Sequence, residues 1–357
     1  MRIVIVGAGA VGSYLAERLA LEGQDVVLVE SSEQRAIEVQ SQIDCMVVNG
    51  NGASGSTLVK AGLNDADLLI AVSSSDAINV LACSAATSIG IPRTVARVED
   101  PELKAEVEEL GVDFIIDPGE AAARDLLTLV KRGAISDLVE FADGQLVLLG
   151  AYVAPDAAFV GVTWAVLRRA VDGWTWLVVA VIRLGETMIA RGSTVLEAHD
   201  HVLLMAQADK TAEAYELLGI SDKAAEKVIV LGATRLAQVT AAMLADNGIS
   251  TTLIDEDRKR CHLIAERLPR VVAVCGSPTD PKLLMAEGVD AADSVLALSG
   301  WDGNNLLACL VAKELGAGEV IARFTNTELV GLLSSAGLDA TVSSRLSAAN
   351  EILRFVR

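Results

Sequence analysis

The chain opens with MRIVIVGAGAVG at residues 1–12, where a short apolar run leads directly into a glycine-rich loop. The run has the length and β-branched character of a strand, and the residues after the loop have helical periodicity. A GxGxxG spacing between a strand and a helix is typical of a dinucleotide-binding turn, because its glycines allow a tight turn, a close pyrophosphate and close helix packing. A glycine-rich turn without a ligand is the less favoured alternative. The predicted binding residues of this loop are Gly7, Gly9, Ala10, Val11 and Gly12.

An acidic residue follows the loop at the distance that such a site requires. Glu30 ends the next apolar run, 18 residues after Gly12, close to the roughly 20 residues expected for the carboxylate that binds a ribose. A carboxylate accepts hydrogen bonds from ribose hydroxyls and repels a 2′-phosphate. Glu30 therefore favours NAD(H) or an adenine nucleotide over NADP(H).

Polar side chains follow the fourth and fifth predicted strands of this region. Ser73 and Ser74 come directly after the apolar run Leu68 to Val72, and Arg97 ends the next one. Open parallel sheets bind ligands at the carboxyl ends of their strands, so we expect these three side chains to contact the same nucleotide. The segment Ser73 to Asp76 is also compatible with a helix N-cap that binds nothing.

The chain repeats itself at an offset of 225 to 226 positions. This period is too long for a solenoid and indicates a duplicated domain. The coincidences include Gly7 with Gly232, Glu30 with Asp255, Gly50 with Gly276, Asp76 with Asp302, Asn79 with Asn305, Cys83 with Cys309 and Arg97 with Arg323.

Each copy alternates short apolar runs with segments of helical length, the first predicted helix covering Ser13 to Glu22. Continuous apolar runs are typical of parallel strands that are covered on both faces, so each copy is predicted to be a Rossmann-like α/β domain. Between the copies, strand runs joined by turns at 143–144 and 184–185 predict a small α+β module, with helices at 164–171 and 209–218. The predicted organisation is residues 1–133 and 228–357 as the two Rossmann-like domains, residues 134–218 as the α+β module and residues 219–227 as a linker.

The second copy departs from the first at its glycine loop. Thr234 stands where the pyrophosphate would come closest, although Asp255 keeps the acidic function. We expect nucleotide binding there to be weakened, altered or absent. Trp301 either stacks on an adenine or is merely a loop aromatic residue. The predicted second-site residues are Gly232, Asp255, Ser299 and Arg323.

Composition excludes several classes of protein. The net charge of −19 disfavours nucleic-acid binding and an anionic membrane surface. Apolar residues make up 52% of the chain, but no run approaches the roughly 18 apolar residues of a spanning helix. Five cysteines without CxxC spacing favour a reducing compartment, and the glycine loop interrupts any signal-peptide pattern. We expect a soluble cytoplasmic protein.

Catalytic and metal sites are not predicted. The cluster at residues 199–201, His-Asp-His, lacks further ligands and is more typical of a polar turn than of a metal site. The first cleft has no candidate histidine or lysine acid–base for hydride transfer, which argues against an NAD-dependent dehydrogenase, the main alternative.

The whole chain resembles the bacterial Trk-type potassium uptake regulatory proteins, the TrkA family, which are built from RCK (KTN) domains. The resemblance is carried by GAGAVG with Glu30, VVNGNG at 47–52, AVSSSDAIN at 71–79 and VAR at 95–97. In the middle region it is carried by VAVIR at 179–183 and Asp200, and at the end by AANEILRFVR. The middle module is then of the RCK C-terminal type.

The resemblance implies a regulatory function without enzymatic activity. Such a subunit senses NAD(H) or ATP/ADP, assembles as a homo-oligomer, either a dimer or a ring, and gates a membrane potassium translocation subunit of Trk/Ktr type. It would be cytoplasmic and peripheral on the inner face of the membrane. Regulation of another ion transporter or of potassium efflux is an open alternative, because the partner surface is not identified.

Overall fold

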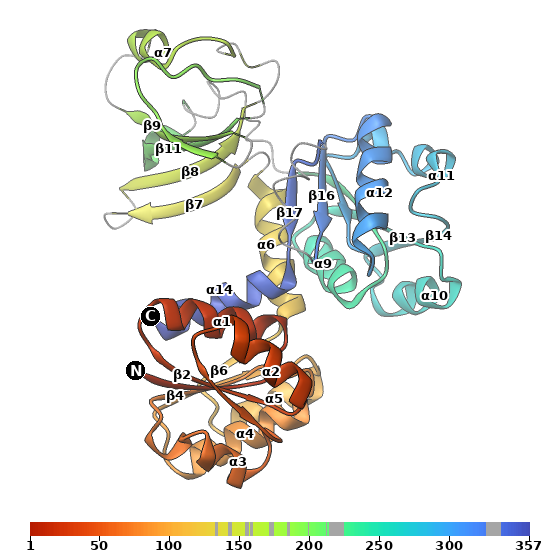
Figure 1. Ribbon diagram of the computed structural model, residues 1–357. Helices are drawn as coiled ribbons and strands as arrows, with labels where there is room; N and C mark the ends of the chain where they lie inside the picture. Colours follow the sequence, from red (N-terminus) through yellow and green to blue (C-terminus); the bar gives the residue numbers. More distant parts are fainter. Residues whose placement is uncertain are drawn as a thin grey trace. The chain divides into compact units, whose positions relative to one another are not determined.

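The computed structural model describes residues 1–132, 135–141, 145–153, 157, 160–170, 175–183, 186–198, 200–211, 213, 225–325 and 337–357. Contacts divide the chain into two units, residues 1–122 with 343–357 and residues 123–342. The described residues form two six-stranded parallel sheets and one five-stranded antiparallel sheet (Figure 1). This confirms the predicted α/β class, with a small module that lies between two Rossmann-like domains in the sequence.

The first sheet has the strand order β3-β2-β1-β4-β5-β6, and all its strands are parallel. The chain order therefore reverses beside β1, which places the end of β1 at the switch point where such sheets bind ligands. The strands are β1 (Arg2–Val6), β2 (Asp25–Glu30), β3 (Met46–Asn49), β4 (Leu68–Ala71), β5 (Arg93–Arg97) and β6 (Phe114–Ile116).

Apolar side chains on both faces of this sheet are buried, as its uninterrupted apolar runs predict. Ile3 and Ile5 of β1 belong to one core cluster, and Val4 and Val6 belong to the cluster on the opposite face. Helices cover both faces because a parallel sheet needs a crossover between successive strands. The helices are α1 (Ala10–Leu21), α2 (Glu33–Gln42), α3 (Gly55–Lys60), α4 (Asp76–Ser88) and α5 (Pro101–Glu109).

The first helix starts earlier than the sequence predicted. α1 begins at Ala10 rather than Ser13, because its N-cap is Gly9, inside the glycine loop itself. The N-terminal turn of α1 is therefore part of the loop that ends β1.

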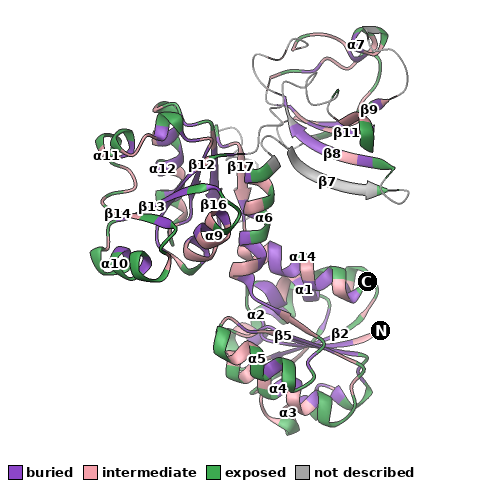
Figure 2. Cartoon of the chain, turned by 180° about the vertical axis from the view of Figure 1, so that it is seen from behind, coloured by how far each residue is buried: buried purple, intermediate pink, exposed green. Residues whose placement is uncertain are grey.

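The last helix of the chain packs on the first sheet. α14 (Ser344–Val356) lies beside α1 (Figures 1 and 2), and its apolar face belongs to the same core cluster as β1 and α1. Phe355 stacks on Phe114 of β6 with ring centroids 5.0 Å apart. The guanidinium of Arg93 donates to the carbonyl oxygens of Phe355 and Val356 at 3.3 and 3.4 Å. These carbonyls end the helix and have no partner within it, so a cation there is favourable.

The closing helix of the first copy makes the equivalent contact in the second unit. α6 (Pro118–Arg132) carries Lys131, whose Nζ donates to Oδ1 of Asn247 at 2.6 Å. Lys131 and Asn247 occupy the repeat positions of Arg357 and Glu22, which form an ion pair in the first unit. The final helix of each copy thus contacts the other copy's fold.

The second parallel sheet repeats the order of the first, as β14-β13-β12-β15-β16-β17. Its first strand begins at Lys227, within the predicted linker. The strands are β12 (Lys227–Leu231), β13 (Ser250–Asp255), β14 (Val271–Cys275), β15 (Ser294–Ala297), β16 (Glu319–Arg323) and β17 (Ala340–Val342), and the helices are α9 (Arg235–Asp246), α10 (Arg258–Arg267), α11 (Pro281–Ala286) and α12 (Asp302–Glu314).

The middle module is an antiparallel sheet of order β10-β9-β11-β8-β7 with one described helix, α7 (Trp164–Ala170). The rings of Trp164 and Trp176 meet at 5.1 Å in its core. The turns predicted at 143–144 and 184–185, and most of the helix predicted at 209–218, lie outside the described residues. Its strands are β7 (Ile135–Phe141), β8 (Leu146–Tyr152), β9 (Trp176–Arg183), β10 (Glu186–Ile189) and β11 (His201–Gln207).

Candidate nucleotide site

The glycine loop of the first module lies at the carboxyl end of β1. Gly7 has φ +101°, and a Cβ there would come within 2.7 Å of the Ser73 backbone. A Cβ on Gly12 would come within 1.9 Å of the Gly7 carbonyl oxygen. Both positions therefore need glycine for reasons internal to the fold: a left-handed turn in one case and close helix packing in the other.

Gly9 has no such internal reason to be glycine. Its backbone is extended, at φ −69° and ψ −173°, which every residue can adopt, and a Cβ there would meet nothing within 4 Å. As the N-cap of α1 it provides no side-chain hydrogen bond to the helix. The loop thus leaves space beside the N-terminus of α1, where backbone N–H groups and the helix dipole favour an anion.

Glu30 lies at the end of β2 and holds the glycine loop through the backbone. Its carboxylate accepts from Ala8 N at 2.9 Å and from Ser32 N at 2.8 Å. Burial alone raises the pKa of Glu30, but the hydrogen bonds from Ser32 and Ala8 outweigh it, so the pKa lies below its ordinary value. Each carboxylate oxygen has more than one lone pair, so this ionised group can also accept from ribose hydroxyls.

The ends of β4 and β5 are tied together by a buried amide. Asn79 accepts from Ser73 N at 2.9 Å and donates to the carbonyl oxygens of Ser73 and Arg97 at 3.0 and 2.9 Å. Asn79 is fully buried, so it positions the two strand ends. The Arg97 guanidinium forms an ion pair with Glu99. Ser75 also caps α4, as the alternative interpretation of Ser73 to Asp76 predicted, because its hydroxyl accepts from Ile78 N.

A cavity of about 360 Å³ joins these strand ends. Its volume is within the range of small-molecule sites. Gly12 is the one predicted first-site residue that does not line it, since Gly12 packs beneath the loop. The predicted residues that line the cavity are Gly7, Gly9, Ala10, Val11, Glu30, Ser73, Ser74 and Arg97.

The second module has the same backbone plan, but a side chain fills the space beside its loop. Thr234 has φ −64° and ψ 165°, close to the angles of Gly9. Its hydroxyl donates to Leu298 O at 2.7 Å and accepts from Ala237 N at 3.3 Å. The side chain therefore caps α9 and occupies the space equivalent to the one that Gly9 leaves open in the first module. The sequence analysis expected a pyrophosphate to come closest to the loop at this position.

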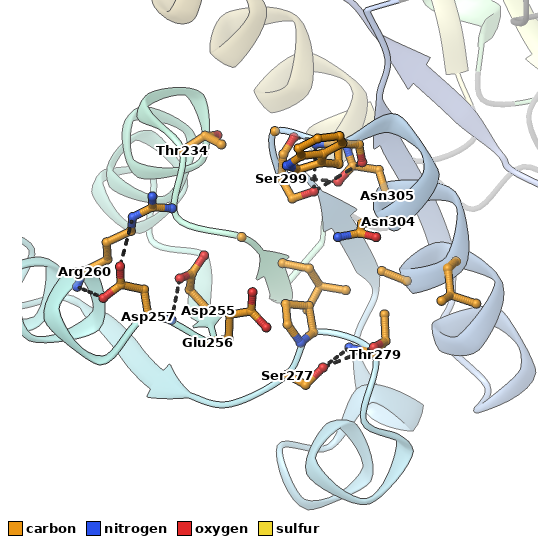
Figure 3. A pocket seen from close by; sticks show the side chains of 17 residues that line it. Thr234, Asp255, Glu256, Asp257, Arg260, Ser277, Thr279, Ser299, Asn304 and Asn305 are labelled. Atoms are coloured by element: carbon orange, nitrogen blue, oxygen red, sulfur yellow. Dashed lines mark hydrogen bonds and ion pairs between the residues drawn. The ribbon is translucent and has the colours of Figure 1, made fainter.

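The acidic residue of the second module keeps its role toward the loop. Asp255 accepts from Ala233 N at 2.8 Å and from Asp257 N at 2.9 Å, matching the pattern of Glu30. Asp257 also forms an ion pair with Arg260 at 3.5 Å (Figure 3). Three consecutive acidic residues, Asp255 to Asp257, line this side of the cavity together with the single cation Arg260. The acidic charges outnumber the cation there, so this side favours hydroxyl and cationic groups over phosphates.

The second cavity is larger than the first, at about 540 Å³. Asn305 ties Ser299 to Arg323 O in the manner of Asn79, and Arg323 donates to Ser299 O at 3.3 Å instead of lining the cavity. Trp301 lines the cavity with 77% of its surface exposed, so its ring is open to a stacking partner. Of the predicted second-site residues, the structure places Gly232, Asp255 and Ser299 in the lining.

The predicted polar turn of the middle module carries an ion pair. Asp200 is buried and accepts from Arg183 Nε and Nη2, both at 2.7 Å. His199 lies outside the described residues. Across the described part of the chain, no group of three or more histidine, cysteine or acidic side chains is placed to hold a metal ion.

Sequence reasoning missed one cation beside the glycine loop. Arg35 Nε donates to Ala8 O at 3.1 Å, and its Nη1 pairs with Glu38 at 2.8 Å. Arg260 occupies the equivalent position in the second module. The repeat of an arginine five residues after the acidic strand end in both copies was the signal that could have identified it.

No helix in the described parts of the chain is long and apolar enough to cross a membrane. Fold and cleft together define a class: a tandem pair of Rossmann-type modules, one with an open glycine loop and one with a loop capped by Thr234. Comparisons with known proteins identify the family. The TrkA-N domain model matches residues 3–118 and 228–344, so both parallel-sheet modules are matched.

Curated relatives match over the full chain. The chain is 33% identical to the Trk system potassium uptake protein TrkA homolog of Archaeoglobus fulgidus, covering 100% of this chain and 81% of that protein. It is 30% identical to the TrkA protein of Vibrio alginolyticus, covering 100% and 79%. The chain belongs to the TrkA family of Trk system potassium uptake proteins, as the resemblance implied.

Solved structures support the fold. The GsuK RCK domain superimposes with a TM-score of 0.67 at 21% identity, covering 98% of this chain and 75% of that one. The GsuK channel bound to NAD gives a TM-score of 0.68 at 22% identity, covering 98% and 62%. At these identities the likeness establishes the RCK-type fold alone.

Proposed function

We propose that this protein is the nucleotide-sensing regulatory subunit of a potassium uptake system, with NAD(H) or ATP/ADP bound in the first cleft. Membership of the TrkA family supports the role in potassium uptake. The observation that carries the nucleotide site is the open space at Gly9 beside the side-chain-uncapped N-terminus of α1. A pyrophosphate fits there because it needs a close backbone and N–H donors.

The first cleft holds a nucleotide through the residues that line it. Backbone N–H groups of Ala10 and Val11 face the phosphates, Glu30 accepts from the adenosine ribose, and Ser73, Ser74 and Arg97 contact the other half of the ligand. The lowered pKa of Glu30 keeps its carboxylate ionised at neutral pH, and this negative charge disfavours a 2′-phosphate. NADPH should therefore bind more weakly than NADH.

The protein regulates rather than catalyses. Within residues 1–132, all described, the cavity lining contains no histidine or lysine that could serve as a hydride-transfer acid–base. Nucleotides with different affinities for two conformations of the assembly shift the population between them, and a membrane potassium translocation subunit responds to that shift. The working form is a homo-oligomer, a dimer or a ring, on the inner face of the membrane.

The second cleft fits a ligand that places no pyrophosphate at its loop. Thr234 occupies that space, and Asp255 to Asp257 repel phosphates. Gly232, Asp255 and Ser299 would contact a nucleoside, with Trp301 as its stacking surface, while Arg323 holds the Ser299 backbone.

Calorimetric titration of the purified chain with NADH, NAD, ATP and NADPH tests the proposal, alongside Glu30→Ala. The expected result is micromolar binding of NADH or ATP, weaker binding of NADPH and loss of binding in the variant. Potassium uptake by cells that lack their own uptake regulator, with the wild type and the variant supplied in turn, tests the regulatory role. Absence of binding by all four nucleotides would refute the first-cleft assignment.

A further inference from the structure

Two cysteines lie together beside the second cleft. Cys275 ends β14 opposite Asp255 of β13 in the parallel register, and Cys261 is in the first turns of α10, which packs on β14. The Cys261 Sγ is 3.2 Å from Asp255 O and 3.5 Å from Val274 O, the carbonyl directly before Cys275. The thiols are therefore held side by side by the backbone.

The two thiols differ in access. Cys275 is exposed and its Sγ lies 3.8 Å from Glu256 O, whereas Cys261 is buried. Burial raises the pKa of Cys261, and the charge and hydrogen bond of Cys275 add to the effect. Cys261 thus stays a protonated thiol until its neighbour reacts.

The first module has no counterpart of this pair. The repeat positions of Cys261 and Cys275 are Ala36 and Asn49. Cys83 and Cys309, by contrast, recur in both modules as buried core residues, and burial raises the pKa of each to about 12. The pair therefore belongs to the second module alone, and packing of the repeated fold does not require it.

We propose that Cys275 and Cys261 form a peroxide-sensitive thiol pair that closes to a disulfide at the edge of the second cleft. The Cys275 thiol ionises and its sulfur attacks one oxygen of hydrogen peroxide, so that an S–O bond forms and the O–O bond breaks. The leaving hydroxide takes up the proton that the thiol released, which gives a sulfenic acid and the first water. The Cys261 sulfur then attacks the Cys275 sulfur, so that the S–S bond forms, the S–O bond breaks and the second water leaves. Two electrons and two protons pass from the thiols to the peroxide.

Oxidation acts on the wall of the second cavity. The reduced thiols contact the carbonyl oxygens of Asp255 and Glu256, and both residues line that cavity. The disulfide removes both S–H donors from this segment. The Asp255 side chain holds the glycine loop through Ala233 N, so a shift of this segment reaches the loop. This inference goes beyond the proposed function and does not require a nucleotide in either cleft.

Mass spectrometry of the full-length protein tests the proposal directly. After hydrogen peroxide treatment and alkylation of remaining thiols, the intact chain should lose two hydrogen atoms. Non-reducing tryptic digestion should then give residues 261–267 joined to residues 271–282, since arginine or lysine bounds both peptides. The same digest after peroxide treatment in guanidinium should give mixed pairings among the five cysteines.

Cysteine variants distinguish Cys275, which reacts with peroxide, from Cys261, which then attacks the sulfenic acid. Cys261→Ser should leave a Cys275 sulfenic acid that dimedone traps, and Cys275→Ser should leave Cys261 reduced. Cys45→Ser, the matched cysteine loss in the first module, should form the cross-link as the wild type does. Hydrogen exchange of residues 255–260 should change on oxidation in the wild type and not in Cys275→Ser. Over-oxidised Cys275 without the cross-link, or a Cys275–Cys275 bond between two chains, would overturn the proposal.

Discussion

Replacing Gly9 with threonine gives the first module the loop of the second. The fold tolerates this change, because the backbone at Gly9 is extended, nothing lies within 4 Å of its Cβ position, and Thr234 occupies the same conformation in the second module. Threonine and glycine differ as N-caps by only a few tenths of a kcal/mol, so the melting temperature should move by no more than about 2 °C.

Nucleotide binding should not tolerate the Gly9→Thr substitution. A threonine side chain there occupies the space beside the α1 N-terminus and caps the helix, as Thr234 caps α9. A pyrophosphate then loses about two charge-assisted hydrogen bonds, together at least about 3 kcal/mol, which weakens binding on the order of 100-fold.

Calorimetry with NADH and ATP measures this loss, and a thermal melt of the same sample measures stability. Thr234→Gly is the matched control, because it makes the reverse change at the equivalent position and should leave affinity in the first cleft unchanged. Unchanged affinity in Gly9→Thr would refute the placement of the pyrophosphate over this residue. A collapse of the melting temperature would instead show that the fold itself requires glycine there.

Three further outcomes follow from buried or packed side chains. Asn79→Ala should lower the free energy of unfolding by roughly 3 kcal/mol, because it removes three hydrogen bonds from the Asn79 side chain to Ser73 and Arg97. It should also weaken nucleotide binding. Urea denaturation measures the first effect and calorimetry the second, and unchanged affinity would mean that Asn79 does not position the site. Phe355→Ala should lower the free energy of unfolding by about 2 kcal/mol through the lost stacking on Phe114. Arg354→Ala, on the exposed face of the same helix, should not lower it measurably. Thermal melts of the two variants measure this difference. Burial, with a smaller contribution from Asp339, raises the pKa of Glu319 to about 8. Its folded pKa exceeds the unfolded value of about 4.3, so its contribution to stability is complete below about pH 4.3 and declines as the pH rises to about 8. Glu319→Gln should reduce the decline of the melting temperature between about pH 4.3 and about pH 8. Glu314→Gln, at an exposed position, should not. The same pH dependence in the wild type and in Glu319→Gln would contradict the burial argument.

Local sequence determined the strands and the glycine loop. The apolar runs of β1, β2 and β4 are long enough for a strand and too short for a helix in the core, so their state does not depend on distant residues. The loop was equally local, since Gly7 and Gly12 serve contacts within a few residues or with the adjacent strand. The error of three residues at the start of α1 arose because glycine is a weak signal for an N-cap.

The sequence did not predict on which sheet each closing helix packs. α6 and α14 are both amphipathic and follow equivalent strands, so the apolar pattern of α14 fits either sheet equally well. The stacking of Phe355 on Phe114 and the capping of α14 by Arg93 became evident in the folded chain.

Local residue patterns were enough to predict two Rossmann-type modules that flank a small α+β module in the chain, the acidic strand ends and the difference between Gly9 and Thr234. Each of these features depends on residue type within a short stretch of sequence. The contacts that join distant segments came from the tertiary structure: the Asn79 side chain of α4 ties Ser73 to Arg97, and Cys261 of α10 lies beside Cys275 of β14. The physical reason is that parallel register and helix packing bring together residues that are distant in the chain, and neither is encoded by a local period.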